Sequence, residues 1–231
     1  MKRILLKLSG EFLQSEDALW EPQKLSAIVD SLKRLHEEKI QVAIVIGGGN
    51  IFRGGKNAYV LDRCEADEIG MAATSVNALM LKAVFHAQNL PCLTFGSDLK
   101  GGSIKPFILD EVLEALQQNN IVIFSGGTGH PFFSTDTAAV LRAIEIKANI
   151  LLKATKVDGV YEKDPMLFKD AKRWDRLTYQ HVCEQHYAVM DACAFELCRA
   201  HKMPIFIFNL HHESAIYKAA HQQLIGTFIG E

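Results

Sequence analysis

The sequence predicts an α/β protein whose open, mainly parallel sheet is sandwiched between helices. Short, almost wholly apolar segments alternate with segments of helical periodicity from residue 3 to residue 154. This alternation is typical of parallel strands joined by crossover helices, and apolar strands indicate a sheet covered on both faces. The 231 residues contain no linker, internal repeat or low-complexity tract, so we expect one domain over residues 1–231.

The predicted strands are short segments rich in Ile, Val and Leu that stop at glycine, a hydroxyl residue or a turn. In chain order they are Arg3–Leu8, Gln41–Ile46, Cys92–Phe95, Ile121–Phe124, Ile150–Ala154, Pro204–Phe208 and Thr227–Ile229. We expect the last of these to form a closing edge strand. The turn-rich stretch before Asp164-Pro165 predicts a hairpin around Asp158-Gly159.

The predicted helices carry apolar residues three and four positions apart. In the first of them these are Leu25, Ile28, Val29 and Leu32, and Pro22 lies in the first turn, where proline is tolerated. In chain order the helices are Pro22–His36, Asp67–Ala87, Ile108–Gln118, Ala138–Ile146, Tyr179–His186, Asp191–His201 and Glu213–His221.

The composition narrows the class of protein. Hydrophobic residues make up 48% of the chain, the formal net charge is −2, and no basic stripe indicates a nucleic-acid surface. The longest apolar runs are about six residues, well below the ~20 that a membrane span needs, so we expect no membrane partner. The five cysteines form no CxxC motif, which favours reduced thiols and a cytoplasmic protein.

Several predicted strands end in glycine, hydroxyl or charged residues. These ends are Ser9-Gly10, Gly47–Asn50, Gly96–Asp98, Ser125–Ala139 and Lys153–Thr155. Ligands of open parallel sheets bind beyond the carboxyl ends of the strands, and a helix N-terminus favours anions. The pattern therefore predicts an anion-binding site at this edge, with ordinary tight turns as the alternative.

The best-known phosphate motifs do not match. Residues 49–57 read GNIFRGGKN, one residue too long for a P-loop, and Phe52 stands where a dinucleotide fingerprint needs its third glycine. A metal site is not expected, because His181, Cys183 and His186, like His211-His212, lack zinc-ligand spacing.

An ordered set of motifs resembles the bacterial uridylate kinases of the amino-acid kinase superfamily. The motifs are KLSG (Lys7–Gly10), GGGNIFRG (Gly47–Gly54), ADEIGM (Ala66–Met71), GTGHPFFSTDTAA (Gly127–Ala139), KATKVDGVY (Lys153–Tyr161) and MDACAFELC (Met190–Cys198). The resemblance extends from residue 2 to about residue 209. It implies a three-layer αβα fold, with an acceptor part over roughly residues 1–150 and an ATP part over roughly residues 151–231.

The resemblance also implies a reaction and a set of site residues. The reaction is transfer of the γ-phosphoryl group of ATP to UMP, with Mg²⁺ accompanying ATP. The implied catalytic residues are Lys7, Arg53, Asp136 and Asp191, the two carboxylates serving to orient positive charge. The implied ATP-binding residues are Lys7, Leu8, Ser9, Gly10, Gly49, Arg53, Thr155, Tyr161 and Asp164. The implied UMP-binding residues are Gly48, Asp67 at the start of the long helix, Thr128, Gly129, His130, Pro131, Phe132, Phe133, Ser134 and Thr135.

Departures from the family pattern leave some properties open. His130 stands where relatives usually carry Asn, and Leu81-Lys82-Ala83 replaces an Arg-Asp pair linked to GTP regulation. We therefore do not expect activation by GTP, whereas inhibition by UTP and a homohexamer are consistent with the resemblance. Two alternatives stay open: a superfamily kinase with a small acyl acceptor, and a non-catalytic nucleotide sensor.

Overall fold

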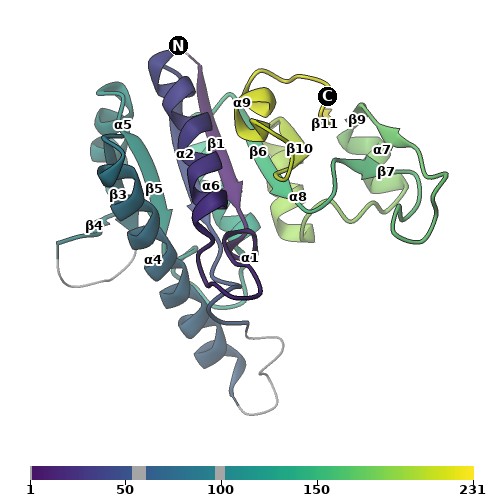
Figure 1. The fold of residues 1–231 in the computed structure, drawn as a ribbon. Coiled ribbons are helices and arrows are strands. Elements are labelled where there is room, and N and C mark those ends of the chain that lie inside the picture. The colour runs from purple at the N-terminus through teal and green to yellow at the C-terminus, as the bar shows by residue number, and fades with distance from the viewer. Residues whose placement is uncertain (1, 54–60, 97–101) are drawn as a thin grey trace.

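The centre of the computed structural model is a nine-stranded sheet with the order β4-β3-β5-β2-β1-β6-β10-β11-β9 (Figure 1). The structure describes residues 2–53, 61–96 and 102–231. The strands are β1 (Arg3–Leu8), β2 (Gln41–Ile46), β3 (Cys92–Gly96), β4 (Lys105–Pro106), β5 (Ile121–Ser125), β6 (Ile150–Thr155), β9 (Arg176–Thr178), β10 (Ile205–Asn209) and β11 (Gly226–Gly230). A separate antiparallel pair is formed by β7 (Val160–Tyr161) and β8 (Arg173–Trp174).

The strands of the large sheet pair in parallel, except that β10 and β11 are antiparallel. The predicted mainly parallel sheet is therefore confirmed. The prediction that Thr227–Ile229 closes the edge was wrong, because β9 adds in parallel outside β11. Strand β9 has only three residues, too few to show a periodicity in the sequence.

Helices cover both faces of the sheet, which gives the expected three layers. The helices are α1 (Gly10–Leu13), α2 (Pro22–Glu37), α4 (Arg63–Ala87), α5 (Leu109–Gln117), α6 (Thr135–Glu145), α7 (Tyr179–Glu184), α8 (Ala192–Ala200) and α9 (Ala215–Ala220). One face packs against α2, α4 and α9, and the other packs against α5, α6 and α8 (Figure 1).

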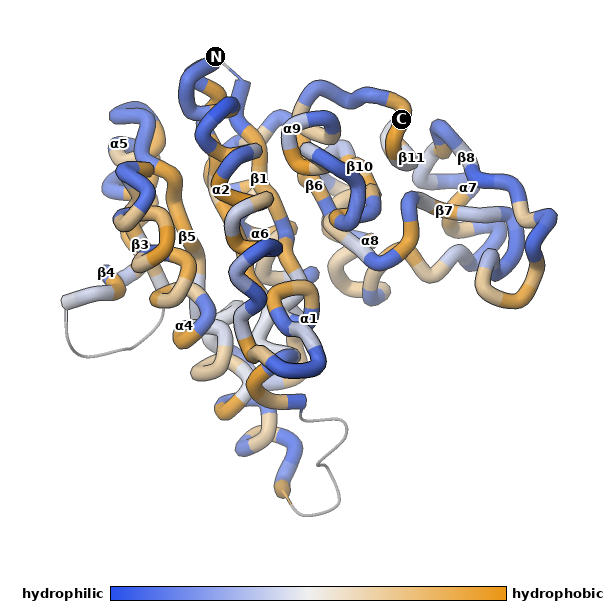
Figure 2. The backbone as a smooth tube through the Cα atoms, in the orientation of Figure 1, coloured by the Kyte–Doolittle hydropathy of each residue, from blue (hydrophilic) through white to orange (hydrophobic). Residues whose placement is uncertain are grey.

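Side-chain alternation along β1 divides the core in two. Ile4, Leu6 and Leu8 join the hydrophobic cluster under α2, whereas Leu5 joins the cluster under α6. Figure 2 shows the largely hydrophobic strands between helices whose outer turns are hydrophilic. Because successive side chains point to opposite faces, Lys7 lies on the same face as Leu5, toward α6.

Three further expectations need correction. The long helix begins at Arg63, capped by Asp62, so Asp67 lies in its second turn and does not open it. Helix α6 begins at Thr135, three residues before the predicted start, because the Ser134 hydroxyl caps it. No tight hairpin forms around Asp158-Gly159; that turn precedes β7, and the strands of the pair are joined by residues 162–172.

Helix α4 is long and apolar enough, by length and composition alone, to cross a membrane. It packs on β3 and β5, where Ala78, Leu81 and Phe85 are fully buried. Its N-terminal half extends beyond the carboxyl ends of the strands (Figure 1). The C-terminal half of α4 is therefore apolar because it packs in the core of the protein.

Candidate active site

Two lysines meet on one carboxylate at the carboxyl ends of β1 and β6. The strands are parallel neighbours in which Lys7 and Lys153 are register partners, so both side chains lie on the α6 face. Helix α6 places Asp136 in its first turn, opposite them. The Lys7 Nζ is 2.7 Å from Asp136 Oδ1, and the Lys153 Nζ donates to Oδ2 at 2.6 Å. The predicted link between Asp136 and Lys7 is present, and Lys153 extends it to a triad.

The triad is largely shielded from water and carries a net positive charge. Side-chain exposure is 13% for Lys7, 12% for Lys153 and 15% for Asp136. Burial alone would raise the pKa of Asp136, but the two ammonium groups outweigh it and hold that pKa below its usual value. Burial lowers the pKa of Lys153, against the opposing effect of Asp136. Two ammonium groups against one carboxylate favour an anionic group beside them.

Asp191, which the resemblance implies as a second carboxylate that orients positive charge, lies at the N-terminus of α8. Burial has the largest effect on the pKa of Lys153 and lowers it, whereas the charge of Asp191 raises it. Its carboxylate caps α8 by accepting from the Ala194 N–H at 3.0 Å. It also accepts hydrogen bonds from Ser134 Oγ at 2.5 Å and from Thr137 Oγ1 at 3.2 Å. Ser134 in turn accepts from the N–H groups of Asp136 and Thr137. Asp191 therefore joins the N-termini of α6 and α8 next to the triad.

The first glycine loop, Ser9-Gly10 after β1, packs tightly against the second glycine loop, Gly47–Asn50 after β2. A Cβ atom on Gly10 would lie 2.4 Å from Asn50 Oδ1 and 2.5 Å from the Gly47 carbonyl oxygen, so a side chain there is excluded. The Leu8 side chain is fully buried in the core, which leaves only its backbone for the predicted contact with ATP. Gly48 packs under α4, where a Cβ atom would lie 2.8 Å from Ala73 Cβ.

A cavity of about 340 Å³ opens where these loops meet β6. Its lining includes Lys7, Ser9, Lys153, Thr155 and Lys156, together with Glu11, Phe12, Lys24, Ala154, Leu210 and His211. Arg53 reaches its rim by pairing with Glu11, whose other oxygen lies 3.1 Å from Lys156 Nζ. The concentration of lysines suits a polyphosphate group.

A second cavity, of about 400 Å³, continues from Thr155 to the loop after β7. Tyr161 and Asp164 line it, and so do Gly159, His186 and Tyr187. The Tyr161 hydroxyl donates to Asp158 at 2.5 Å, and Asp164 accepts from the Met166 N–H at 2.8 Å. The three residues predicted to hold the adenine nucleoside therefore share one cavity.

The segment from Gly126 to Ser134 forms the loop between β5 and α6. Gly126, Gly127 and Gly129 have φ of 76°, 59° and 79°, a left-handed conformation that glycine adopts without strain. Asp67 binds this loop from α4, since its Oδ2 accepts from the Phe132 N–H at 2.8 Å. The same oxygen accepts from Arg63 Nε at 2.8 Å.

The predicted acceptor residues present a surface rather than a buried pocket. Phe132 and Phe133 are 66% and 50% exposed, and His130 is exposed. The Thr128 hydroxyl bonds to both the N–H and the carbonyl of His130 at 3.1 Å, which fixes this turn. Adjacent exposed aromatic rings on a loop that leads into α6, the helix that carries Asp136, are suited to a ligand with a flat base and an anionic group.

Sequence reasoning assigned no individual role to three side chains that line the 340 Å³ cavity. Lys153 was predicted at a polar strand end but not as a catalytic or ATP-binding residue, although its in-register position beside Lys7 could be inferred from the two parallel strands. Glu11 and Lys156 follow two predicted strand ends and were not singled out. The predicted loop Gly96–Asp98 falls largely outside the described residues, since only its Gly96 is described.

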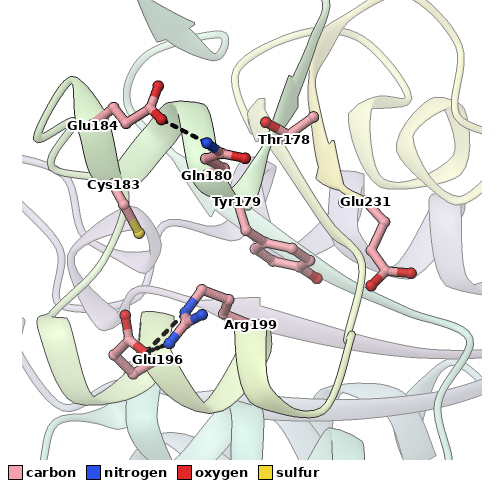
Figure 3. A pocket seen from close by; sticks show the side chains of 9 residues that line it. Thr178, Tyr179, Gln180, Cys183, Glu184, Glu196, Arg199 and Glu231 are labelled. Carbon is pink, nitrogen blue, oxygen red and sulfur yellow. Dashed lines mark hydrogen bonds and ion pairs between the residues drawn. The ribbon is translucent and has the colours of Figure 1, made fainter.

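A larger cavity, of about 750 Å³, lies between α7, α8 and the end of β11 (Figure 3). None of the predicted site residues lines it. Its charged and polar groups pair locally, Glu196 with Arg199 at 2.7 Å and Gln180 with Glu184 at 2.7 Å. The chemistry of the site is therefore concentrated in the two smaller cavities and the adjoining loop.

Among the residues that the structure describes, no group of three or more His, Cys, Asp or Glu side chains could hold a metal ion. Asp136 in the triad and Glu11 in the 340 Å³ cavity are both committed to ion pairs. A divalent cation would fit here as one carried mainly by phosphate oxygens.

Comparisons with known proteins agree with this geometry. The family model for the amino acid kinase family matches residues 2–209. The uridylate kinase of Actinobacillus pleuropneumoniae serotype 5b is 44% identical over 230 residues, covering 99% of this chain and 97% of that protein.

Solved structures agree equally. The UMP kinase of Bacillus anthracis superposes with a TM-score of 0.94 at 36% identity, covering 99% of this chain and 96% of that one. The UMP kinase of Ureaplasma parvum superposes with a TM-score of 0.94 at 29% identity, covering 100% of this chain and 99% of that one. The expected resemblance and three-layer fold are confirmed: this chain belongs to the amino acid kinase family and, within it, to the uridylate kinases.

Proposed function

We propose that this protein is a nucleoside monophosphate kinase that transfers the γ-phosphoryl group of ATP to UMP, giving UDP and ADP. The observation that carries the proposal is the triad in which Asp136 holds the ammonium groups of Lys7 and Lys153 side by side. The similarity of this protein to uridylate kinases over essentially the whole chain supports UMP as the acceptor.

The chemistry requires no general base. The second pKa of a phosphate monoester is about 6, so the attacking oxygen of UMP is largely ionised at neutral pH. That oxygen forms a bond to the γ-phosphorus while the bond to the bridging oxygen of ADP breaks. The barrier arises from bringing two polyanions together, and fixed positive charge lowers it. The paired lysines supply this charge without having to reorganise.

We assign the two smaller cavities and their connecting edge to ATP. The phosphates lie in the cavity of Lys7, Ser9 and Lys153, along the backbone of Leu8 and Gly10, with Gly49 and Arg53 on the opposite side. The adenine nucleoside occupies the cavity of Thr155, Tyr161 and Asp164. Magnesium accompanies ATP and neutralises its phosphate oxygens.

We assign the acceptor to the opposite side of the triad. Gly48 and Thr128 to Thr135, including Gly129 and Pro131, surround UMP, and Asp67 receives hydrogen bonds from its ribose. The Asp67 carboxylate is suited to that role because it is ionised. Burial alone would raise the pKa of Asp67, but the hydrogen bonds that it accepts from Arg63 and Phe132 outweigh burial and lower that pKa. The acceptor half so defined corresponds to roughly residues 1–150, and the ATP half to roughly residues 151–231.

The proposal also covers regulation and assembly. We propose a cytoplasmic homohexamer in which the exposed apolar residues Ile69 and Val76 of α4 lie at a subunit interface. UTP would compete with UMP, and GTP would not activate because Leu81-Lys82-Ala83 replaces the Arg-Asp pair linked to GTP regulation. Light scattering and UDP formation with each nucleotide test these points; a monomer, or activation by GTP, would contradict them.

A phosphorylation assay with ATP and Mg²⁺ tests the proposed function across UMP, CMP, carbamate and acetylglutamate. We expect turnover with UMP at far lower concentration than with the other acceptors. Turnover only with a non-nucleotide would establish the small-acyl alternative. Tight nucleotide binding without turnover of any acceptor would establish the sensor alternative.

A further inference from the structure

Glu11 places a carboxylate inside the cavity that is otherwise lined by lysines. It lies in the first turn of α1, directly after the first glycine loop, and its side chain is 18% exposed. Its Oε1 pairs with Arg53 and its Oε2 lies 3.1 Å from Lys156 Nζ. Arg53 follows β2 and Lys156 follows β6, so one carboxylate joins cations from the two halves of the site.

The two cations depend on this carboxylate. Among the described residues, Glu11 provides the one carboxylate paired with Arg53 and the one paired with Lys156. The Lys156 side chain is 78% exposed and that of Arg53 is 42% exposed, so little packing fixes either of them. Without Glu11, the entropy of two long side chains would oppose a single arrangement.

The same carboxylate opposes a polyphosphate ligand. Glu11 shares the cavity with Lys7 and Lys153, and Gly49 brings the second glycine loop to it, since a Cβ atom there would lie 3.3 Å from Glu11 Oε1. The Glu11 carboxylate and the phosphates of a ligand in this cavity would repel each other, and the repulsion is stronger in a partly buried cavity than in water. An incoming phosphate therefore competes with Glu11 for the same two cations.

Resting on the proposed function, we propose that Glu11 is a positioning residue that holds Arg53 and Lys156 at the phosphate cavity and releases them to the phosphate oxygens of ATP. The contact sets the arrangement of the cations before ATP arrives, at the cost of weaker ATP binding. A purely structural ion pair would act only on stability.

Removing the charge at constant size separates these roles. We expect Glu11→Gln to bind ATP about three- to tenfold more tightly, the range of one modest ion pair. Its turnover at saturating ATP and UMP should fall at least about fivefold, because the cations are no longer held in one geometry. Calorimetry with ATP and a UDP-formation assay on the full chain measure the two quantities. Damage to the fold would weaken both, so the opposite signs are diagnostic.

Three further variants serve as controls. Glu11→Asp keeps the charge and should bind ATP within about twofold of wild type. Glu37→Gln, which changes the same charge on an exposed residue of α2, should change neither quantity. Lys156→Met alters a side chain exposed enough to leave folding intact, and should weaken ATP binding and reduce the gain produced by Glu11→Gln.

The outcomes are separable. If Glu11→Gln binds ATP no more tightly than wild type does, Glu11 does not compete with ATP for the two cations. If its turnover is unchanged, Glu11 does not hold the cations in position. If Glu11→Gln does not fold, unaltered ATP affinity in Lys156→Met overturns the proposal by itself. Wild type that binds ATP but does not phosphorylate UMP would refute the proposed function only. Wild type that does not bind ATP would refute both.

Discussion

Lys7 and Lys153 are register partners on adjacent parallel strands, and their ammonium groups are bound to the two oxygens of one aspartate. Strand register fixes the two Cα positions, and the first turn of α6 fixes the carboxylate, so the charges are set by regular structure rather than by loops. Groups held on strands and helices keep their geometry more closely than groups on loops. The positive centre is therefore preorganised for a developing negative charge.

Removal of the first lysine should slow the reaction without preventing acceptor binding. We expect Lys7→Ala to lower turnover at least ~100-fold, the scale of lost transition-state charge stabilisation. UMP affinity should stay near that of wild type, because the acceptor loop contacts α4 through Asp67 rather than through Lys7. Steady-state rates and UMP titration measure both, and normal turnover would refute the role of Lys7.

Removal of the second lysine should have a similar effect on turnover. Lys153→Met retains most of the apolar stem but loses the ammonium group that donates to Asp136 and to the Val189 carbonyl. We expect turnover to fall at least ~100-fold. Lys169→Met, at an exposed residue of the loop after β7 that lines none of the cavities described above, is the control and should stay within about twofold of wild type. A Lys153 variant as active as this control would show that one lysine is sufficient.

The fold and most of the site were predictable because their signals are local. Apolar runs located β1 and β2 to the residue, and glycines with positive φ marked the loop after β5. Register between strands is not local, since the pairing of Lys7 with Lys153 joins residues far apart in sequence. The start of α8 at Asp191 was predicted, whereas the cap Ser134 was missed as a helix start, because it acts together with Asp191 through a contact that no single segment encodes.

Neutralising the shared aspartate should destabilise the fold. Asp136→Asn would leave two ammonium groups paired with no carboxylate in a site where each is less than one-seventh exposed. Loss of one partner from a buried charge cluster costs about 3 kcal/mol in free energy of unfolding. Urea denaturation at pH 7 measures the loss. Asp170→Asn, whose side chain is 80% exposed, should change the unfolding free energy by less than about 0.5 kcal/mol. Equal stabilities of the two variants would contradict the triad.

The same aspartate predicts a dependence of stability on pH. Its pKa is lowered in the folded state, so its stabilising contribution is complete above the unfolded pKa of about 3.9 and is lost as pH falls through the lower folded value. The difference in unfolding free energy between wild type and Asp136→Asn should therefore be constant from about pH 5 to 7 and shrink below about pH 4. Denaturation at a series of pH values measures this difference. A difference that grows as the solution is acidified would reverse the sign and refute the ion pairs.

The cap that joins α6 to α8 should couple stability to acceptor binding. Ser134→Ala removes the oxygen that accepts from two N–H groups of α6 and donates to Asp191, and we expect a loss of about 1–2 kcal/mol in unfolding free energy. The KM for UMP should rise at least about threefold, because Ser134 also ends the acceptor loop and fixes where α6 begins. Thr178→Ala is the matched control, because the Thr178 hydroxyl caps α7 by accepting from the His181 N–H. It should lose a comparable amount of stability and leave the KM for UMP unchanged. A KM that shifts equally in both variants would mean that the effect follows general destabilisation rather than the position of α6.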